Sequence, residues 1–357
     1  MKIGFDIGIA SLRGTHVAIY DYALHNQSIL GNESIIFYQN SDQQISEVLN
    51  KFKQQFQLVA YDSLDQLNNL ASQLKVDRFY LIKSGENDSY LLPSIPNLVH
   101  AVFPQNRNQR HGNAYAFVSK WLSTECSNGL IPYVPHMISL PKHEENLRRQ
   151  LSIPPNSLVF GNYGGSDSFN LGFVRELLGE IVHKNRNIYF LFMNIPSFVE
   201  HPQVIFLPGS ADLNYKAQFI NTVDAMIHAR GIGESFGIAC GEFSILNKPI
   251  MTYALSPQRN HLEILGSKAL LYRGPRELEQ LIRGFDQNWA RSQDWDCYSK
   301  EFSPQAVMNK FDSVFIKPDI TKSSSFNYGI NDLINIQLRR LTKKGRSLSR
   351  KYHLYIH

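Results

Sequence analysis

The chain has 357 residues, of which 43% are hydrophobic and 19% charged, and its formal net charge is +5. This profile predicts about two globular domains with a hydrophobic core. Three widely separated cysteines, Cys126, Cys240 and Cys297, argue against a disulfide framework and predict a reducing, cytoplasmic setting. No apolar run has the length of a membrane span, and Met1–Ile7 is too short an apolar run for a signal peptide.

Strands and helices are predicted to alternate along the first third of the chain. This alternation implies a parallel sheet with helices on both faces. Thr15 is expected to cap the first helix. The predicted strands are Lys2–Ile7, Glu33–Tyr38, Leu58–Tyr61, Arg78–Ile82, Asn97–Phe103 and Ala114–Val118, and the predicted helices are Val17–Leu24, Ile45–Phe52 and Leu64–Leu74.

A proline-punctuated stretch, Ile131–Pro155, is interpreted as the boundary between two domains, because the alternation restarts after it. The sequence therefore predicts an α/β protein with Rossmann-like, doubly wound domains at 1–150 and 151–318, followed by a linker and tail at 319–357. The later strands are expected at Leu158–Gly161, Ile188–Met193, Val204–Leu207, Val223–Ala229 and Lys248–Tyr253, and the helices at Phe173–His183, Leu213–Asn221, Phe236–Leu246, Leu278–Trp289 and Pro304–Phe315.

The tail carries the positive charge. Seven Lys and Arg residues lie between 339 and 351 with no acid among them, so the rest of the chain has a net charge of about −2. Apolar residues accompany these cations across Ile330–Tyr352. Two hypotheses stay open: a basic amphipathic helix on an anionic membrane, which would make the protein peripheral to the membrane, or a solvated segment. No aromatic stacking platform accompanies the charge, so nucleic acid is not an expected partner.

The stretch that bears most on function is the loop Arg230–Gly237, between a predicted strand and the start of a predicted helix. Helix N-termini favour anions, above all phosphate. Glu234 lies in the loop and Glu242 lies in the second turn of the helix. Two carboxylates on either side of a helix start suit a ligand with a central phosphate and hydroxyls at both ends, as in a nucleotide-sugar.

This loop and helix resemble the E-x7-E signature of retaining GT-B glycosyltransferases, and of glycosyltransferase family 4 in particular. The resemblance covers roughly residues 1 to 315 and includes a glycine-bearing loop, Ser11–His16, after the first strand. It implies a GT-B fold, in which two Rossmann-like domains face each other across a cleft. It also implies a retaining, metal-independent hexosyltransferase without a cofactor. The donor would be a UDP- or GDP-hexose, and the acceptor a glycan, a lipid-linked saccharide or a protein.

The resemblance also implies roles for individual residues. Glu242 would hold the ribose hydroxyls of the donor, and Glu234 would lie beside its sugar. Backbone amides near Phe236 and Gly237 would contact the sugar and the diphosphate.

Three further residues come from the first domain. Gly14 and Arg13 would approach the donor diphosphate or the acceptor. His100 would face the reacting sugar as a catalytic residue, although a core histidine with satisfied hydrogen bonds is an open alternative.

One part of the family pattern is missing. Members usually carry an arginine and a lysine soon after the first strand of the second domain, where this chain has Asn162 and no lysine. Backbone amides or hydroxyls would then bind the diphosphate, or an arginine would reach in, or activity would be low. The candidate replacements are Gly164, Gly165, Ser166, Ser168, Arg230 and Arg259.

Two other functions are open alternatives. The missing cations would suit a non-catalytic sugar- or nucleotide-binding protein, or a partner subunit, with the same fold. Ile3–Ser11 resembles the first phosphate loop of actin-like sugar kinases, which is an Asp-x-Gly hairpin. Asp294-Trp-Asp296 imitates a metal-binding D-x-D motif, but it lies between predicted helices, and no metal site is expected.

Overall fold

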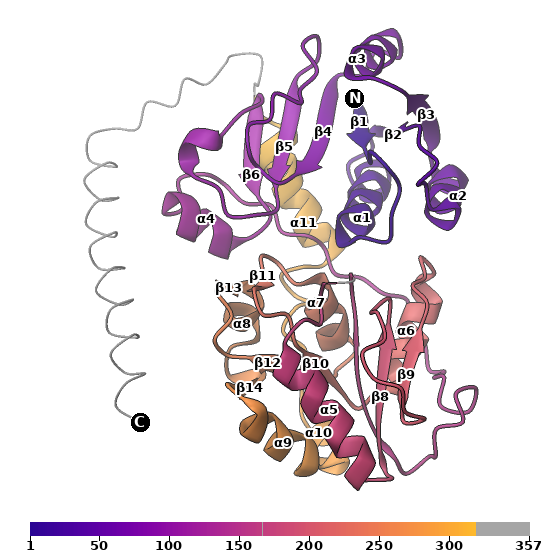
Figure 1. Ribbon diagram of the computed structural model, residues 1–357. Helices are drawn as coiled ribbons and strands as arrows, with labels where there is room; N and C mark the ends of the chain where they lie inside the picture. The colour runs from indigo at the N-terminus through magenta and orange to yellow at the C-terminus, as the bar shows by residue number, and fades with distance from the viewer. Residues whose placement is uncertain (166, 319–357) are drawn as a thin grey trace.

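The computed structural model describes residues 1–165 and 167–318. Ser166 and the tail at 319–357, with its membrane hypothesis, lie outside the described residues. Two six-stranded sheets form the two halves of the molecule (Figure 1), and every strand pair within them is parallel. The strand orders are β3-β2-β1-β4-β5-β6 and β14-β12-β10-β7-β8-β9.

The first sheet is built around β1, whose residues Ile3 and Phe5 are fully buried. Helices pack on this sheet because the connections between its first four parallel strands are helical, as predicted. The elements of this half are β1 (Lys2–Asp6), α1 (Gly14–Ser28), β2 (Glu33–Gln39), α2 (Ser46–Gln55), β3 (Gln57–Tyr61), α3 (Leu64–Gln73), β4 (Arg78–Lys83), β5 (Asn97–Ala101), the short η1 (Arg107–Gln109), β6 (Ala114–Phe117) and α4 (Lys120–Ser127).

One expectation for this half was wrong, and one alternative is excluded. Helix α1 begins at Gly14, so Thr15 lies inside the first turn and does not cap the helix. The sugar-kinase hypothesis needs a hairpin after the first strand. Instead, β1 is followed by α1 and pairs in parallel with β2 and β4, which excludes that hairpin.

The second sheet is built around β7 and β10, which adjoin where the strand order reverses. A two-stranded sheet, β11-β13, lies beside it. The elements are β7 (Leu158–Tyr163), α5 (Gly172–Lys184), β8 (Ile188–Met193), β9 (Val204–Leu207), α6 (Leu213–Thr222), β10 (Ala225–His228), β11 (Gly233–Glu234), α7 (Ile238–Ile245), β12 (Ile250–Tyr253), β13 (Gln258–Arg259), α8 (Asn260–Leu265), η2 (Gly266–Lys268), β14 (Ala269–Tyr272), α9 (Pro275–Arg283) and α10 (Gln287–Ser292).

The last described helix, α11 (Pro304–Phe311), and the turn η3 (Asp312–Ile316) pack against the first half (Figure 1). Phe311 stacks on Tyr22 with ring centroids 5.2 Å apart. The guanidinium of Arg78 donates to the Phe315 carbonyl. Although residues 304–318 follow the second half in sequence, their apolar face completes the core beneath α1 and β4.

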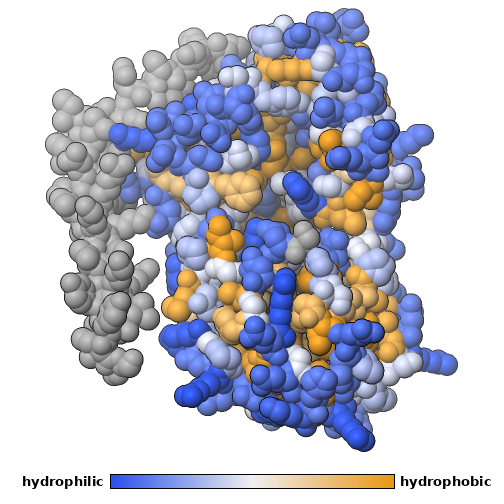
Figure 2. Space-filling view, in the orientation of Figure 1, coloured by the Kyte–Doolittle hydropathy of each residue, from blue (hydrophilic) through white to orange (hydrophobic). Residues whose placement is uncertain are grey.

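The two halves meet along the edges where their strands end. A side-chain carbon added at Gly14 would lie 3.5 Å from the Ile238 side chain, so the starts of α1 and α7 are close together. Lys51 also crosses between the halves, because its ammonium donates to the Ala211 carbonyl at 3.0 Å. Figure 2 shows a hollow between the halves with hydrophobic residues in its walls. In doubly wound folds, ligands bind at these carboxyl ends of the strands.

Candidate functional site

Glu234 lies at the end of β11, on the route from β10 into α7. Its Oε1 is 3.2 Å from Nε2 of His228, and its Oε2 accepts from Arg230 at 3.1 Å. Arg230 also contacts Asp167 at 3.3 Å. The Glu234 side chain is 19% exposed, so it remains accessible while two donors fix it. Since Arg230 serves two carboxylates, its charge is already largely neutralised.

The start of α7 is shaped by Gly237, which holds the left-handed φ of 95°. A side-chain carbon there would come within 3.3 Å of the Glu234 Cβ and 3.2 Å of the His261 Cβ. No side chain caps α7 or α1 in the described residues, so no capping side chain occupies the first amides of either helix. Arg13 and Gly14 are exposed at the start of α1.

Phe236 differs from the other loop residues because its side chain belongs to the core. It is 2% exposed, and its ring lies edge-on to Phe302 at 5.3 Å. Its carbonyl accepts from the Asn260 amide at 2.9 Å. Only the backbone of Phe236 therefore remains a candidate for ligand binding.

His100 has no exposed surface. Its Nδ1 is 2.6 Å from the Tyr80 hydroxyl, and its Nε2 is 2.8 Å from the Val134 carbonyl. Burial lowers the pKa of His100 to about 4, so the ring is neutral at physiological pH. These contacts favour the alternative of a core histidine with satisfied hydrogen bonds.

Glu242 lies in the second turn of α7 and is 2% exposed. Its Oε1 accepts from the Lys216 ammonium at 2.9 Å, whereas its Oε2 is buried without a partner among the described residues. Burial raises the pKa of Glu242 well above its ordinary value, and the nearby Asp21 carboxylate adds to the rise. A buried carboxylate oxygen without a donor is costly, so a bound hydroxyl would stabilise it.

Sequence reasoning missed Lys216. It lies on the buried face of α6, and its ammonium is 5.3 Å from the centre of the Tyr163 ring at the end of β7. Burial lowers the pKa of Lys216 to about 8, although Asp21 counters part of the effect. The sequence held one signal: Lys216 shares the helical spacing of Leu213, Ala217 and Ile220, which places a cation on an apolar face.

The segment after β7 lacks the expected cations, and its side chains serve the fold. The Asn162 amide donates to the Ile227 carbonyl at 2.6 Å, which joins β7 to β10. Gly164 accepts from the Asn194 amide at 2.7 Å, and Gly165 accepts from the Ser168 hydroxyl at 2.7 Å. The Gly164 and Gly165 amides therefore lie in a loop that its own contacts hold in place.

A charged cluster that includes Glu242 lies where the two halves meet. It contains Asp21 and Lys51 from the first half and Lys216 and Glu242 from the second. Burial raises the pKa of Asp21 to about 7, while Lys51 and Lys216 oppose the rise. Burial also lowers the pKa of Lys51, against the pull of Asp21 and Glu242. The interface between the halves thus contains ionisable groups with strongly shifted pKa values.

Within residues 1–165 and 167–318, no group of three or more His, Cys, Asp or Glu side chains could hold a metal ion. Asp296 accepts from the backbone amides of Tyr298 and Ser299, and Asp294 pairs with Lys268. In that same part of the chain, no helix is both long enough and apolar enough to cross a bilayer.

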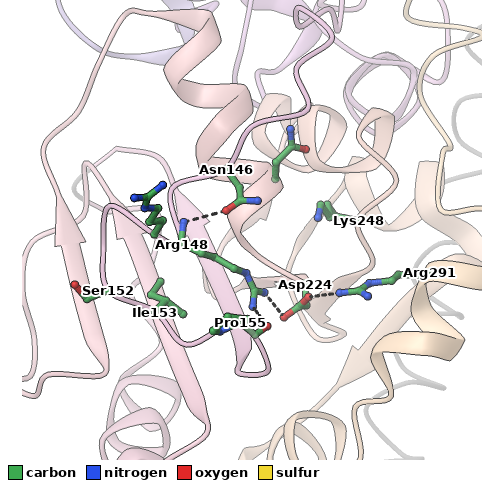
Figure 3. Close-up of a pocket in the computed structure, with 10 residues that line it drawn as sticks. Asn146, Arg148, Ser152, Ile153, Pro155, Asp224, Lys248 and Arg291 are labelled. Carbon is green, nitrogen blue, oxygen red and sulfur yellow. Dashed lines mark hydrogen bonds and ion pairs between the residues drawn. The ribbon is translucent and has the colours of Figure 1, made fainter.

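A cavity of about 800 Å³ lies at the opposite edge of the second sheet, where the strands begin (Figure 3). Arg148 and Arg291 both point to Asp224, with ion pairs of 2.8 Å and 3.9 Å. Arg148 also donates to the Thr222 and Ser157 carbonyls. These bonds anchor the segment between the domains, so the cavity is separate from the candidate site.

No family model and no curated protein matches this chain. Solved structures do match it in fold. Anabaena HepE in complex with UDP-glucose is 14% identical with a TM-score of 0.70, covering 88% of this chain and 99% of that one. A glycosyltransferase from Rickettsia africae is 13% identical with a TM-score of 0.63, covering 90% and 99%. A UDP-N-acetylglucosamine 2-epimerase is 10% identical with a TM-score of 0.55, covering 88% and 96%.

These similarities extend over both halves. Two parallel sheets of six strands face each other along their carboxyl edges, as the resemblance implied. The prediction of fold is confirmed: this chain has the GT-B fold.

Proposed function

We propose that the chain is a glycosyltransferase that moves a hexose from a nucleotide-diphosphate sugar to a saccharide or glycoconjugate acceptor. The observation that carries the proposal is the pair of glutamates around the start of α7. Glu234 is partly exposed beside the helix start, and Glu242 keeps one buried oxygen without a donor. The likeness to HepE, which binds UDP-glucose, favours UDP over GDP as the donor nucleotide.

In the proposed complex, the unpartnered Oε2 of Glu242 accepts a ribose hydroxyl while Lys216 holds the other oxygen. The donor reaches this buried oxygen when the two halves open, and their closure then excludes water. Glu234 accepts hydroxyls of the donor sugar. The uncapped amides of α1 and α7, with Arg13 and the Gly164 and Gly165 amides, stabilise the diphosphate.

The proposed reaction proceeds with retention and without a metal ion, as the family resemblance implies. The bond from the anomeric carbon to the diphosphate breaks, and the diphosphate leaves with the electron pair. The acceptor oxygen bonds to the same face of that carbon and gives its proton to the departing phosphate oxygen. His100 has no place in this step, because its ring is buried and both nitrogens are engaged.

The donor site is tested by Glu242→Ala. Loss of a charge-assisted hydrogen bond is expected to weaken UDP binding by roughly 1–3 kcal/mol, measured by isothermal titration calorimetry. Glu279→Ala is the matched control, since Glu279 lies on the exposed face of α9 and pairs with Arg283. Equal UDP affinity for wild type and Glu242→Ala would refute the assignment.

A turnover assay distinguishes glycosyl transfer from epimerisation and from non-catalytic binding. UDP-glucose and UDP-N-acetylglucosamine are incubated with the protein and an acceptor panel, and NMR follows the products. Released UDP with a new glycoside supports the proposal. A changed C2 configuration on intact UDP-sugar would indicate an epimerase instead. Tight donor binding without any product would favour the non-catalytic binding protein.

A further inference from the structure

Behind Glu234 lies a row of three buried side chains that the proposed mechanism does not use. His228 ends β10, Thr252 lies on β12, and His261 lies on α8. His228 is paired with Thr252 in the parallel register of the two strands, so both side chains lie at the same level of the sheet. All three are at most 2% exposed.

Hydrogen bonds join these side chains to Glu234 without a gap. The His228 Nε2 is 3.2 Å from Oε1 of Glu234, and its Nδ1 is 3.0 Å from the Thr252 hydroxyl. The same hydroxyl is 3.0 Å from Nε2 of His261. The Nδ1 of His261 is buried and has no partner among the described residues.

The direction of these bonds follows from the chemistry of the first member. An ionised carboxylate only accepts, so Nε2 of His228 carries a proton, and in a ring with one proton Nδ1 then accepts. The Thr252 hydroxyl must then donate to His228, and its oxygen accepts from Nε2–H of His261. The last nitrogen, Nδ1 of His261, is left as a bare lone pair. The tautomers are assigned from this network.

Hydrogen bonds running in the opposite direction would leave a group at the His261 end that is more costly to bury. If Nδ1 of His228 carried a proton, Thr252 would have to donate to His261, and Nδ1 of His261 would become a buried N–H without an acceptor. Orphaned buried N–H groups are rare, whereas under-satisfied acceptors are less so. Burial lowers the pKa of His261 well below its ordinary value, and the Arg259 charge adds to the effect, so this ring stays neutral.

The carboxylate of Glu234 is constrained from its other side as well. Arg230 donates to Oε2 at 3.1 Å, and a Cβ added at Gly237 would lie only 3.3 Å from the Glu234 Cβ, so the glycine leaves room for this side chain. The Tyr272 hydroxyl donates to the His228 carbonyl at 2.8 Å, which steadies the end of β10. Each carboxylate oxygen keeps one lone pair for a further donor.

We propose that His228, Thr252 and His261 form a one-way hydrogen-bond relay that positions Glu234 to accept hydroxyl groups of the donor sugar. This inference rests on the proposed function. The three residues are positioning residues, because they act through Glu234 and do not touch the donor. The relay contributes to recognition of the sugar and not of the nucleotide, which Glu242 holds at the other side of the helix start.

The relay is tested at its centre by Thr252→Val, which removes the hydroxyl and keeps the shape, with Thr252→Ser as the variant that restores it. In Thr252→Val, the gain in affinity of UDP-glucose over UDP is expected to fall at least fivefold. Affinity for UDP alone is expected to stay within twofold of wild type. Thr252→Ser should return the ratio to near the wild-type value. Calorimetry of both ligands on each full-length protein measures the ratio.

A second measurement reads the relay without any ligand. In nitrogen-15 NMR of histidine-labelled protein, with His228→Gln used for assignment, wild type and Thr252→Ser should show His228 protonated at Nε2 only. Thr252→Val should show a mixture of tautomers.

The outcomes separate the two proposals. If wild type binds neither UDP nor UDP-glucose, the proposed function is refuted. The tautomer spectrum is then the remaining test of the relay. A protein that binds both ligands, with the same affinity ratio in Thr252→Val and wild type, would overturn the relay. Protonation of His228 at Nδ1 in wild type would overturn it as well.

Discussion

Glu234 and Glu242 lie on the same loop and helix, yet their surroundings differ sharply. Two donors, His228 and Arg230, hold Glu234 near the surface. Within the described part of the chain Glu242 has one donor, Lys216, and burial raises the pKa of Glu242. Environments that differ in this way commonly separate the roles of two carboxylates. The same residue type is therefore suited to sugar hydroxyls at one position and to ribose hydroxyls at the other.

Gly237 is the residue on which the distance between Glu234 and α7 depends. Gly237→Ala is expected to lower the free energy of unfolding by about 1–2 kcal/mol, the cost of a left-handed conformation for an L-residue. The new Cβ, 3.3 Å from the Glu234 Cβ, would also displace that side chain and weaken UDP-glucose binding. Urea denaturation and calorimetry measure the two effects.

Gly172→Ala is the control for this substitution. Gly172 begins α5, and a Cβ there would meet nothing within 4 Å. Its stability should stay within about 0.5 kcal/mol of wild type. Equal stability and equal UDP-glucose affinity for Gly237→Ala would show that the close approach has no consequence.

At the scale of elements, α11 joins the end of the described chain to the first half. Phe311 is fully buried, stacking on Tyr22 and lying 5.4 Å from the Tyr80 ring. Phe311→Ala is expected to cost about 3–5 kcal/mol of unfolding free energy, since it leaves a cavity in this core. Leu271→Ala is the surface control, because Leu271 is 43% exposed. Similar losses in both variants, measured by urea denaturation, would contradict the packing of α11.

Element types were largely predictable because the strands are short apolar runs. The strands Ile188–Met193 and Val204–Leu207 have the predicted bounds. Helix α4 was missed because its sequence is mostly polar, with Trp121 and Leu122 as its large buried residues. One helix predicted at Leu278–Trp289 is two, since Gly284 ends α9 and Asp286 caps α10.

The site was predictable only where it is local in sequence. Glu234, Gly237 and Glu242 come from one stretch and share a recognisable pattern. Packing brings Lys216 to Glu242, and strand register places Thr252 beside His228, which contacts Glu234. One sequence reveals neither arrangement. His228 could be placed at a strand end, but its partner on the neighbouring strand could not.

At the scale of the whole molecule, the charged cluster between the halves makes stability depend on pH. The pKa of Asp21 is raised to about 7, so the folded protein keeps a proton that the unfolded chain releases above about pH 4. The stabilisation from this proton is complete below about pH 4 and is lost as pH rises through about 7. Lys51, Lys216 and Glu242 are the charged groups around it.

Asp21→Asn removes this titration. The variant should match wild type near pH 4 and exceed its unfolding free energy by roughly 1–3 kcal/mol at pH 7.5, because only wild type then carries a charged carboxylate at residue 21. Urea denaturation at a series of pH values measures the difference. A difference that does not change with pH would show that the Asp21 carboxylate has no raised pKa.

The return of α11 to the first half also sets an order of assembly during synthesis. The sheet of the second half is complete once Tyr272 has been made, whereas the core of the first half still lacks Val307, Met308, Phe311 and Phe315. Domains usually fold on the ribosome in the order in which they are translated. In this chain, the domain that is translated second is the first to have all of its residues, and the first domain gains the last part of its core only afterwards.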